Sequence, residues 1–531
     1  MRFFILALAA VLGGGIRKPR RWGQRLERVW IGAFLIGFFL LTGCASLTPL
    51  PSSTAIQTRV SLGTETPTAF LPATPTATER ATSTFTPSPT FSPTPTPSPT
   101  ATATPAWMGR KLPLYTLRAD LDFAAHTLEV EEEIIYTNRT GVELDKLVLV
   151  VETNRRPDIF HLESLKLNGE KIKPSLEGAR LDIPLEPRLL PDEGVIIEII
   201  YRLDISAKAR DEVFGYLPSQ INIVNWYPFV APYTAEKGWL IYAPSGVGEH
   251  LVYETSDFDV KLKVSDNLVV AASAEGETAD DGWVHYEHKS ARAFVFSVGS
   301  HLSSQTVASE NARVTSYFFP DYEEESTALL EASSKAIDVF SERYAPFPYE
   351  SLSIVQTELN DGMEYDGLIF VGRKFYDEYD GTIKNNLIML TVHEIAHQWW
   401  FGAVGNDNAL EPWIDEAMAL YSERIFYETV YPYPLGWWWH FRIYWFKPKG
   451  WVNATIYDGY DFRAYTNAVY YRGGLFLEDL RDRIGEKAFN AFLQDYAKSY
   501  AGKIATSDDF FMVLDRNTTE DYSDLLEEYF R

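Results

Sequence analysis

Cysteine, positive charge and long apolar runs are all scarce in this sequence. Cys44 is the one cysteine among 531 residues, so no disulfide can form within the chain. The 48 Lys and Arg face 73 Asp and Glu, a net charge of −25, and the first 43 residues hold seven of the basic residues and one acidic residue. The remainder therefore carries −31, which argues against nucleic acid as a partner because phosphate binding requires a basic surface.

The apolar runs are too short for a comfortable transmembrane helix, which needs about 20 residues. The run at 29–41 follows a basic stretch and ends in Leu-Thr-Gly-Cys44, the arrangement of an export signal. These four residues resemble the bacterial lipobox, in which the cysteine is lipidated. The alternative is a membrane helix with a chance cysteine. We expect residues 1–44 to be a lipoprotein signal peptide and Cys44 to anchor the protein outside the cytoplasm, on a bacterial membrane surface.

Beyond Cys44 the composition changes twice along the chain. Residues 45–106 are almost wholly Thr, Pro, Ser and Ala, which predicts a disordered tether. Residues 107–305 hold short stretches that alternate apolar and polar, which predicts an all-β saddle or sandwich domain. Residues 306–531 turn to helical periodicity around a small sheet, so the fold class is α+β. The predicted helices cover 326–345, 385–402, 412–431, 473–485 and 486–502.

The segment "LTVHEIAHQWW" (390–400) carries the clearest chemical pattern. His393 and His397 lie four apart, so a helix presents both on one face, where they can share one metal ion. Glu394 is rotated by roughly 100° and would lie beside the ion, in reach of a water molecule. With nine histidines in the chain, chance gives about one such match per hundred sequences of this kind. Two structural histidines on a buried helix face are the alternative.

A catalytic zinc site needs a third protein ligand and an open position. Glu416 follows His397 after eighteen intervening residues, on the next predicted helix. Two helices joined by a short loop can bring this carboxylate to the histidines. Asp415 is the competing ligand, although one residue of helical rotation points it elsewhere.

These spacings resemble the membrane alanyl aminopeptidase family of zinc gluzincins, which also includes leukotriene hydrolase. Four further segments, in the expected order, resemble that family: "NWYPFVAPY" (225–233), "NDGMEYDGLIF" (360–370), "WIDEAMALY" (413–421) and "VYYRGG" (469–474). The resemblance covers about 107–531. It implies a thermolysin-like catalytic domain that binds one Zn²⁺ through His393, His397 and Glu416, with Glu394 as the general base.

The resemblance also implies roles for residues outside the zinc motif. Tyr470 would stabilise the oxyanion of the intermediate, in preference to its neighbours Tyr465 and Tyr471. Glu364 would bind the free α-amino group of a peptide substrate, next to Gly362 and Met363. Tyr365 departs from the family pattern, which has asparagine there. Glu423, two helical turns beyond Glu416, is either a partner of a metal ligand or an ordinary solvated glutamate.

We therefore expect a zinc aminopeptidase that acts on peptides with a free N-terminus. An endopeptidase or other hydrolase on the same zinc is the alternative, and an inactive binding protein is a weaker one. The oligomeric state is not readable from the sequence. Many family members add a large C-terminal helical domain, whereas this chain stops at Arg531, 134 residues after His397. We expect an open site that tolerates long peptides. The aromatic segment 436–446 reads as core or cleft wall rather than a membrane or sugar patch.

Overall fold

An eight-stranded sheet organises the first part of the chain. The computed structural model describes residues 109–209, 212–265, 267–279 and 282–531. Along β2 the outward residues are mostly charged and the inward ones are apolar except for Glu132, so one face of the sheet is buried. The β1–β14 pair is parallel, and the other neighbouring strands are antiparallel. In spatial order the strands are β16 (Gly276–Thr278), β17 (Val284–Ala291), β14 (Ser256–Val264), β1 (Leu114–Asp122), β2 (Thr127–Thr137), β8 (Gly194–Asp204), β4 (Phe160–Leu167) and β5 (Glu170–Lys171).

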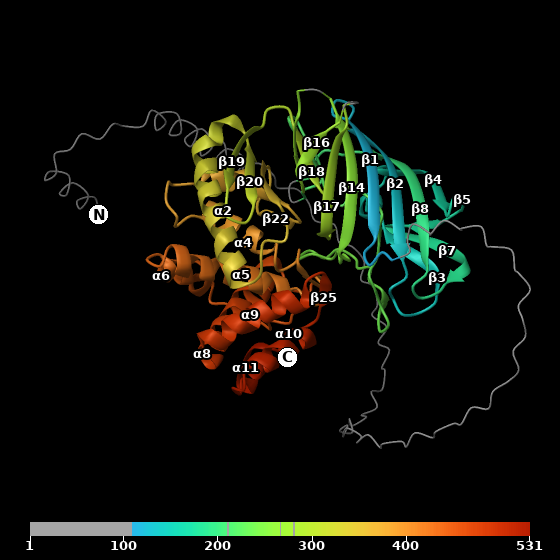
Figure 1. Cartoon of the computed structure of the whole chain (residues 1–531). Helices are drawn as coiled ribbons and strands as arrows, with labels where there is room; N and C mark the ends of the chain where they lie inside the picture. The colour runs from blue at the N-terminus through green and yellow to red at the C-terminus, as the bar shows by residue number, and fades with distance from the viewer. Residues whose placement is uncertain (1–108, 210–211, 266, 280–281) are drawn as a thin grey trace, which may run out of the picture. The chain divides into compact units, whose positions relative to one another are not determined.

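Three smaller sheets complete this β region, drawn in blue to green in Figure 1. Their short strands follow the turn-rich sequence between the longer ones. The first contains β15 (Val269–Ala272), β18 (Phe296–Gly299), β10 (Gln220–Ile223) and β9 (Gly215–Leu217). The others contain β11 (Phe229–Val230), β3 (Leu144–Val150), β7 (Arg180–Leu189) and β6 (Ser175–Glu177), and then β12 (Tyr233–Thr234) and β13 (Gly238–Trp239).

A five-stranded sheet opens the helical region. Its order is β19 (Ser303–Ala308), β20 (Arg313–Phe318), β21 (Ser351–Thr357), β23 (Leu368–Gly372) and β22 (Gly362–Tyr365). Helix α2 (Glu323–Arg343) contacts β19 and β20, and α4 (Asn386–Ala396) contacts β22 and β23. The domain start predicted at residue 306 falls within β19. These contacts bring the helix with the two histidines against the strand that carries Glu364.

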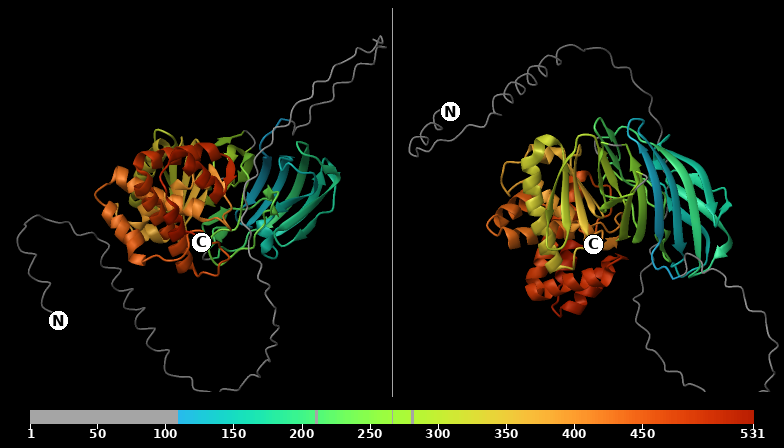
Figure 2. Two further views of the ribbon diagram at one scale, coloured as in Figure 1. Left: turned by 90° about the horizontal axis from the view of Figure 1, so that it is seen from below. Right: turned by 45° about the horizontal axis from the view of Figure 1, so that its top comes forward.

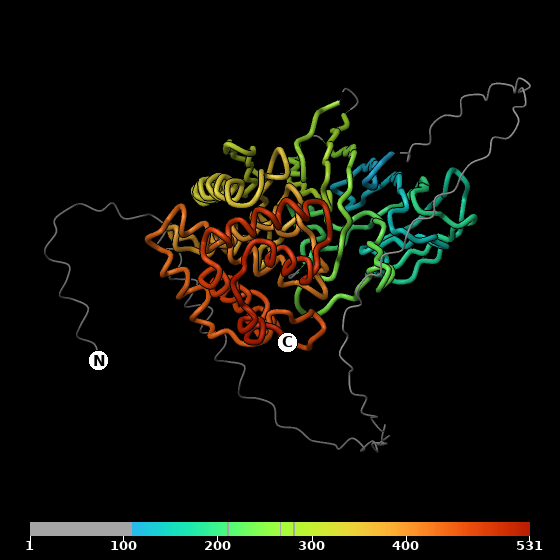
Figure 3. Tube along the Cα trace, turned by 60° about the horizontal axis from the view of Figure 1, so that its bottom comes forward, coloured from blue at the N-terminus to red at the C-terminus, as the bar shows by residue number. Residues whose placement is uncertain are grey.

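The remaining helices lie in the yellow-to-red part of the chain shown in Figure 2, and α5 packs against both α4 and α8. In Figure 3 the red C-terminal helices lie beside the orange segment that contains α5, and contacts of α8 with α5, α9 and α11 agree. A two-stranded sheet pairs β24 (Val404–Asn406) with β25 (Lys503–Ala505). The helices are α3 (Arg373–Asp377), α5 (Trp413–Val430), α6 (Leu435–Trp438), α7 (Phe462–Thr466), α8 (Gly473–Ile484), α9 (Glu486–Tyr500), α10 (Ser507–Asn517) and α11 (Ser523–Tyr529).

Helix α4 ends earlier than the sequence predicts. The prediction placed its end near Gly402, but the helix stops at Ala396 and His397 is its capping residue. Phe401 has a φ of 138°, which no helical residue adopts, and its N–H donates to the carbonyl of Val404. Trp399 and Trp400 are buried, so the apolar pattern continues through a turn that is no longer helical. The turn at 397–403 becomes part of the site described below.

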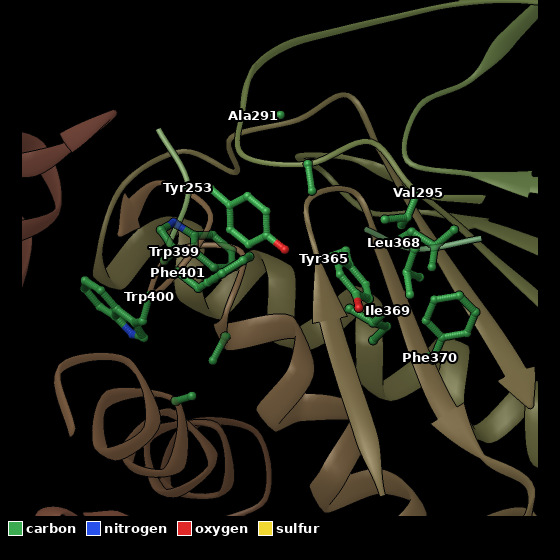
Figure 4. Packing of buried hydrophobic residues seen from close by; sticks show 14 of the residues in the cluster. Tyr253, Ala291, Val295, Tyr365, Leu368, Ile369, Phe370, Trp399, Trp400 and Phe401 are labelled. Atoms are coloured by element: carbon green, nitrogen blue, oxygen red, sulfur yellow. The ribbon is translucent and has the colours of Figure 1, made fainter. Parts of the chain in front are cut away.

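The β region and the helical region share one buried core. Asn222 Nδ2 donates to Thr357 Oγ1 at 2.8 Å, and Gln220 Nε2 donates to the carbonyl of Gln356 at 3.0 Å. Figure 4 shows the shared packing, with Tyr253 from the β region near Phe401 and Tyr365 against the sheet. Among the described helices, none is long and apolar enough to cross a membrane. The predicted signal peptide, Cys44 and the tether at 45–106 lie outside the described residues.

Candidate metal centre

Three side chains predicted as metal ligands converge between α4 and α5. His393 Nε2 lies 3.2 Å from His397 Nε2, and Glu416 Oε2 lies 3.4 Å from His393 Nε2 and 3.5 Å from His397 Nε2. All three residues are buried. Asp415, the alternative ligand, is not among the three side chains whose ligand atoms meet here. The order His393, His397, Glu416 along two packed helices is what brings the atoms together.

These distances fit a zinc ion. Tetrahedral zinc with ligands at about 2.0–2.1 Å holds its ligand atoms about 3.3 Å from one another. The three separations in the structure, 3.2, 3.4 and 3.5 Å, bracket that value. Two imidazoles and one carboxylate are also a donor set that catalytic zinc uses.

Each histidine has its second ring nitrogen fixed by an acceptor. His393 Nδ1 lies 2.9 Å from Glu423 Oε1, and His397 Nδ1 lies 2.9 Å from the carbonyl oxygen of Trp400. Both acceptors require a proton on Nδ1, which leaves the Nε2 lone pairs directed into the site. Although burial would raise the pKa of Glu416, its contacts with His393 and His397 lower that pKa to about 2. The Glu416 carboxylate is therefore ionised, the form that binds a cation.

Glu394 lies in a confined space beside the ligands. It is buried, and its Oε2 has no hydrogen-bond partner within the described part of the chain. A Cβ at position 362 would lie 2.2 Å from Glu394 Oε1, so glycine leaves the space that this carboxylate occupies. Burial, and then the charge of Glu364, raise the pKa of Glu394 well above its usual range. An unpartnered carboxylate with a raised pKa is suited to accept a proton near neutral pH.

Of the three neighbouring tyrosines, Tyr470 reaches the ligands. Its hydroxyl donates to Glu416 Oε1, and its ring stacks on His393 at 6.1 Å. Tyr471, the next residue, turns away and stacks on Phe446 at 5.0 Å. Tyr465 lies 6.1 Å from Tyr470 between ring centroids, and its buried hydroxyl has no hydrogen-bond partner among the described residues. Of the three hydroxyls, that of Tyr470 therefore contacts a predicted ligand directly.

The β22 strand presents Glu364 to the metal ligands. Glu364, Glu394 and His397 each offer an atom within 4.8 Å of the other two. Gly362 and Met363 precede Glu364 on the strand and pair with Val371 and Phe370 of β23. The strand therefore places the buried carboxylate of Glu364 close to Glu394 and to His397.

The structure explains how a tyrosine fits at position 365, where the family pattern has asparagine. Its ring is buried against Phe370 at 6.2 Å between centroids, and Figure 4 shows it beside Ile369. Its carbonyl accepts a hydrogen bond of 3.0 Å from Gln398 Nε2, in the turn after α4. Because successive strand residues point to opposite faces, Tyr365 packs into the core while Glu364 faces the site.

Comparison with known proteins agrees with this geometry. Residues 328–529 match the peptidase family M1 domain. The chain carries an M1 peptidase domain. Aminopeptidase M1-B of Oryza sativa subsp. japonica is 22% identical over 249 residues, which cover 44% of this chain and 28% of that protein. Leucine aminopeptidase 2 of Neosartorya fischeri is 23% identical over 431 residues, covering 74% and 66%, respectively.

The fold is also that of solved M1 structures. The M1 zinc metallopeptidase from Deinococcus radiodurans superposes with a TM-score of 0.57 at 17% identity, covering 76% of this chain and 90% of that one. Its E323A mutant gives a TM-score of 0.59 over 80% and 95%. By contrast, the matched part of this chain spans less than a third of the length of the rice relative.

Glu249 is a site residue that sequence reasoning missed. It is half-buried in the loop before β14, and Asn408 Nδ2 donates to its Oε2 at 3.4 Å. A Cβ on neighbouring Gly248 would lie 2.4 Å from the hydroxyl of Tyr465, so this loop is seated against the M1 domain. Burial, and then the charges of Glu364 and Glu416, raise the pKa of Glu249. No local sequence pattern identifies Glu249 as a residue of the site, because its position there depends on packing between two segments that are far apart in the chain.

Arg292 of the β region supports the turn after α4, which sequence reasoning also missed. Its Nε donates to the carbonyls of Phe401 at 2.6 Å and Gly402 at 3.0 Å, and its Nη2 donates to that of Lys503 at 2.7 Å. Arg292 is buried, and a Cβ on Gly405 would lie 2.3 Å from its Cζ. The turn that supplies the acceptor for His397 is therefore held by a residue 105 positions upstream of that histidine.

Proposed function

We propose that this chain is a zinc-dependent aminopeptidase that removes N-terminal residues from peptides. The observation that carries the proposal is a second trio, Glu364, Glu394 and His397, whose atoms lie within 4.8 Å of one another beside the three ligands. One carboxylate of this trio is free to act as a base, and the other can pair with an ammonium group. The relatives named aminopeptidases support the same activity.

His393, His397 and Glu416 would hold the zinc ion. When bound there, zinc makes water a better nucleophile near neutral pH and polarises a carbonyl group. The hydrogen bonds at His393 Nδ1 and His397 Nδ1 keep both rings oriented, and Glu416 is ionised at any pH where the enzyme would work.

Glu394 is the proton carrier in this proposal. Its Oε2 takes a proton from the attacking water as the carbon–oxygen bond forms. The same atom then gives that proton to the amine that leaves when the carbon–nitrogen bond breaks, so the residue returns to its starting form. Its confined position against Gly362 limits the carboxylate to one orientation, which favours rapid transfer.

Tyr470 supplies a hydrogen-bond donor for the carbonyl oxygen as negative charge develops on it. In the absence of substrate its hydroxyl donates to Glu416 Oε1. Such a donor contributes most when the charge is greatest, in the transition state.

Glu364 accounts for the preference for a free N-terminus. A buried carboxylate favours a positively charged partner, and the α-ammonium group of a peptide supplies one. Glu249 lies in a loop of the β region, and the charge of Glu364 is, after burial, the main cause of its raised pKa. A peptide with a blocked N-terminus would leave both carboxylates without a cationic partner.

The test is metal removal and return, with matched substrates. Chelator-treated protein should lose hydrolysis of aminoacyl-amides and regain it with one equivalent of zinc. The zinc-loaded protein should cleave free aminoacyl-amides at least about 100-fold faster than their N-acetylated forms, because a buried unpaired charge is costly. Equal cleavage of both forms would identify an endopeptidase, and hydrolysis that survives complete metal removal would exclude the zinc mechanism.

A lipid on Cys44 is the proposed attachment to the membrane. The support is the basic stretch, the apolar run at 29–41 and the Leu-Thr-Gly-Cys ending. In a bacterial host, the wild-type chain should incorporate an alkyne fatty acid and sediment with membranes. Cys44→Ser should lose the label; a variant that stays labelled places the lipid elsewhere.

A further inference from the structure

Glu423 is a fully buried carboxylate with four hydrogen-bond donors around it. Its Oε1 accepts from His393 Nδ1 at 2.9 Å and from Arg442 Nη2 at 2.7 Å. Its Oε2 accepts from Trp438 Nε1 at 2.9 Å and from Arg442 Nε at 3.1 Å. A carboxylate has about four lone-pair sites, so this one is saturated.

The donors define one orientation of Glu423. The planar fork of Arg442 contacts both oxygens and fixes the plane of the carboxylate, which an ammonium group could not do. The indole N–H of Trp438 is a donor only, so it pairs with the ionised carboxylate and adds a further fixed contact. Three of the four donors come from these two residues, and the fourth is the metal ligand His393. Arg442 and Trp438 therefore fix the carboxylate of Glu423, and this carboxylate in turn fixes the ring of His393.

Arg442 and Trp438 belong to the aromatic segment 436–446, which the sequence predicts to be core or cleft wall. Trp438 ends α6, and Arg442 lies four residues later in a π-helical turn, Trp439–Ile443. Residues four apart on a helix share a face, so both reach Glu423. Phe441, Tyr444 and Trp445 of the same segment are exposed. Turns of the π type are rare and are enriched at functional sites.

We propose that Arg442 and Trp438 are positioning residues of the metal centre, which fix Glu423 and, through it, keep the Nε2 atom of His393 directed at the ion. This inference rests on the proposed zinc site. It assigns Trp438 and Arg442 to the metal centre, although neither side chain is a ligand. The two histidines are then held in different ways. His393 is fixed by the side chain of Glu423, whereas His397 is fixed by the main-chain carbonyl of Trp400.

The test is zinc affinity in the folded full chain. Arg442→Met removes the fork, Arg442→Lys keeps the charge alone, and Trp438→Phe removes only the indole N–H. The control is Arg463→Met, which alters an exposed arginine that stacks on Phe446 at 4.6 Å and has no bond to Glu423. Each metal-free variant is titrated with zinc against a chromophoric chelator, and its cobalt-loaded form is examined by visible absorption. Circular dichroism checks that it is folded.

We expect Arg442→Met to weaken zinc binding by about 10–100-fold, as loss of a residue that supports a ligand does, and to change the cobalt spectrum. Arg442→Lys and Trp438→Phe should fall between it and the wild type, and Arg463→Met should match the wild type. Zinc affinity and cobalt spectra that stay unchanged in folded Arg442→Met or, should that variant not fold, in Arg442→Lys and Trp438→Phe would overturn the inference. A wild-type chain that does not bind zinc would instead refute the proposed function.

Discussion

The two sides of the candidate site differ in how completely their polar atoms are paired. On the side that would hold the metal, the second nitrogens of His393 and His397 have acceptors, and Glu423 has four donors. On the reacting side, Glu394 Oε2 and the hydroxyl of Tyr465 have no partner among the described residues. Paired atoms fix geometry, whereas a buried unpaired atom stays available for a substrate at a cost in stability. Changes on the reacting side should therefore reduce rate, and changes on the holding side should reduce stability or metal affinity.

Glu394→Gln should have the largest effect. The amide cannot take a proton from water, so kcat should fall by about 10³-fold or more. Zinc affinity should match the wild type, because Glu394 is not one of the three ligands. Turnover and zinc titration on the same preparation check both statements. Loss of zinc together with activity would move Glu394 to the holding side.

Tyr470→Phe should reduce kcat by about 10²-fold, because one oxyanion donor is removed. Zinc affinity should change little, although the hydrogen bond to Glu416 is lost. Tyr471→Phe is the matched control, since that ring stacks on Phe446 rather than on His393. A Tyr470→Phe enzyme with normal kcat would assign the donor role to Tyr465.

Gly362→Ala tests the confinement of the base. The added Cβ would meet Glu394 Oε1 at 2.2 Å, and the carboxylate would have to shift. A displacement near 1 Å costs about 10²-fold in rate, while a flexible side chain can move at little cost to folding. Thermal unfolding should stay near the wild-type value as kcat falls. Gly436→Ala, where nothing lies within 4 Å of the new Cβ, should leave kcat unchanged.

Arg292→Met tests the holding side. The variant leaves the carbonyls of Phe401, Gly402 and Lys503 without their donor in a buried position. The free energy of unfolding should fall by about 2–4 kcal/mol, measured by denaturant titration. Activity per bound zinc should fall far less than in Glu394→Gln. A stable variant would show that water replaces the guanidinium; the control is Arg188→Met at an exposed site.

The pH profile should give the smallest effect. After burial, the charge of Glu364 is the main cause of the raised pKa of Glu394. Removal of that charge lowers the pKa of the base, so the acid limb of kcat should move to lower pH in Glu364→Gln. Glu358→Gln, an exposed glutamate paired with Arg373, should keep the wild-type profile. A shift to higher pH would contradict the assigned electrostatics.

The parts of this account that the sequence predicts depend on short-range patterns. Helical spacing brings His393 and His397 together, and the eighteen-residue interval identifies Glu416. The alternation of apolar and polar residues predicts the strands of the β region, of which β2 is an example. Such features need only the local geometry of one or two elements.

The features that the sequence does not predict depend on packing between segments that are far apart in the chain. Arg292 reaches its carbonyls across more than a hundred positions, and Glu249 enters the site on a loop with no motif. The end of α4 at Ala396 is hidden because buried tryptophans extend the apolar pattern through the following turn. The function of Arg442 is hidden in an aromatic run, because a π-helical turn decides which side chains of that run point inward.

Zinc K-edge absorption of the loaded wild type and of Glu394→Gln tests the centre most directly. The account predicts two imidazole nitrogens, oxygen ligands at about 2.0–2.1 Å and no sulfur, with the same spectrum in both proteins. Fewer than two imidazoles, or a spectrum that changes when Glu394 is replaced, would contradict a centre in which His393, His397 and Glu416 hold the metal and Glu394 moves the proton.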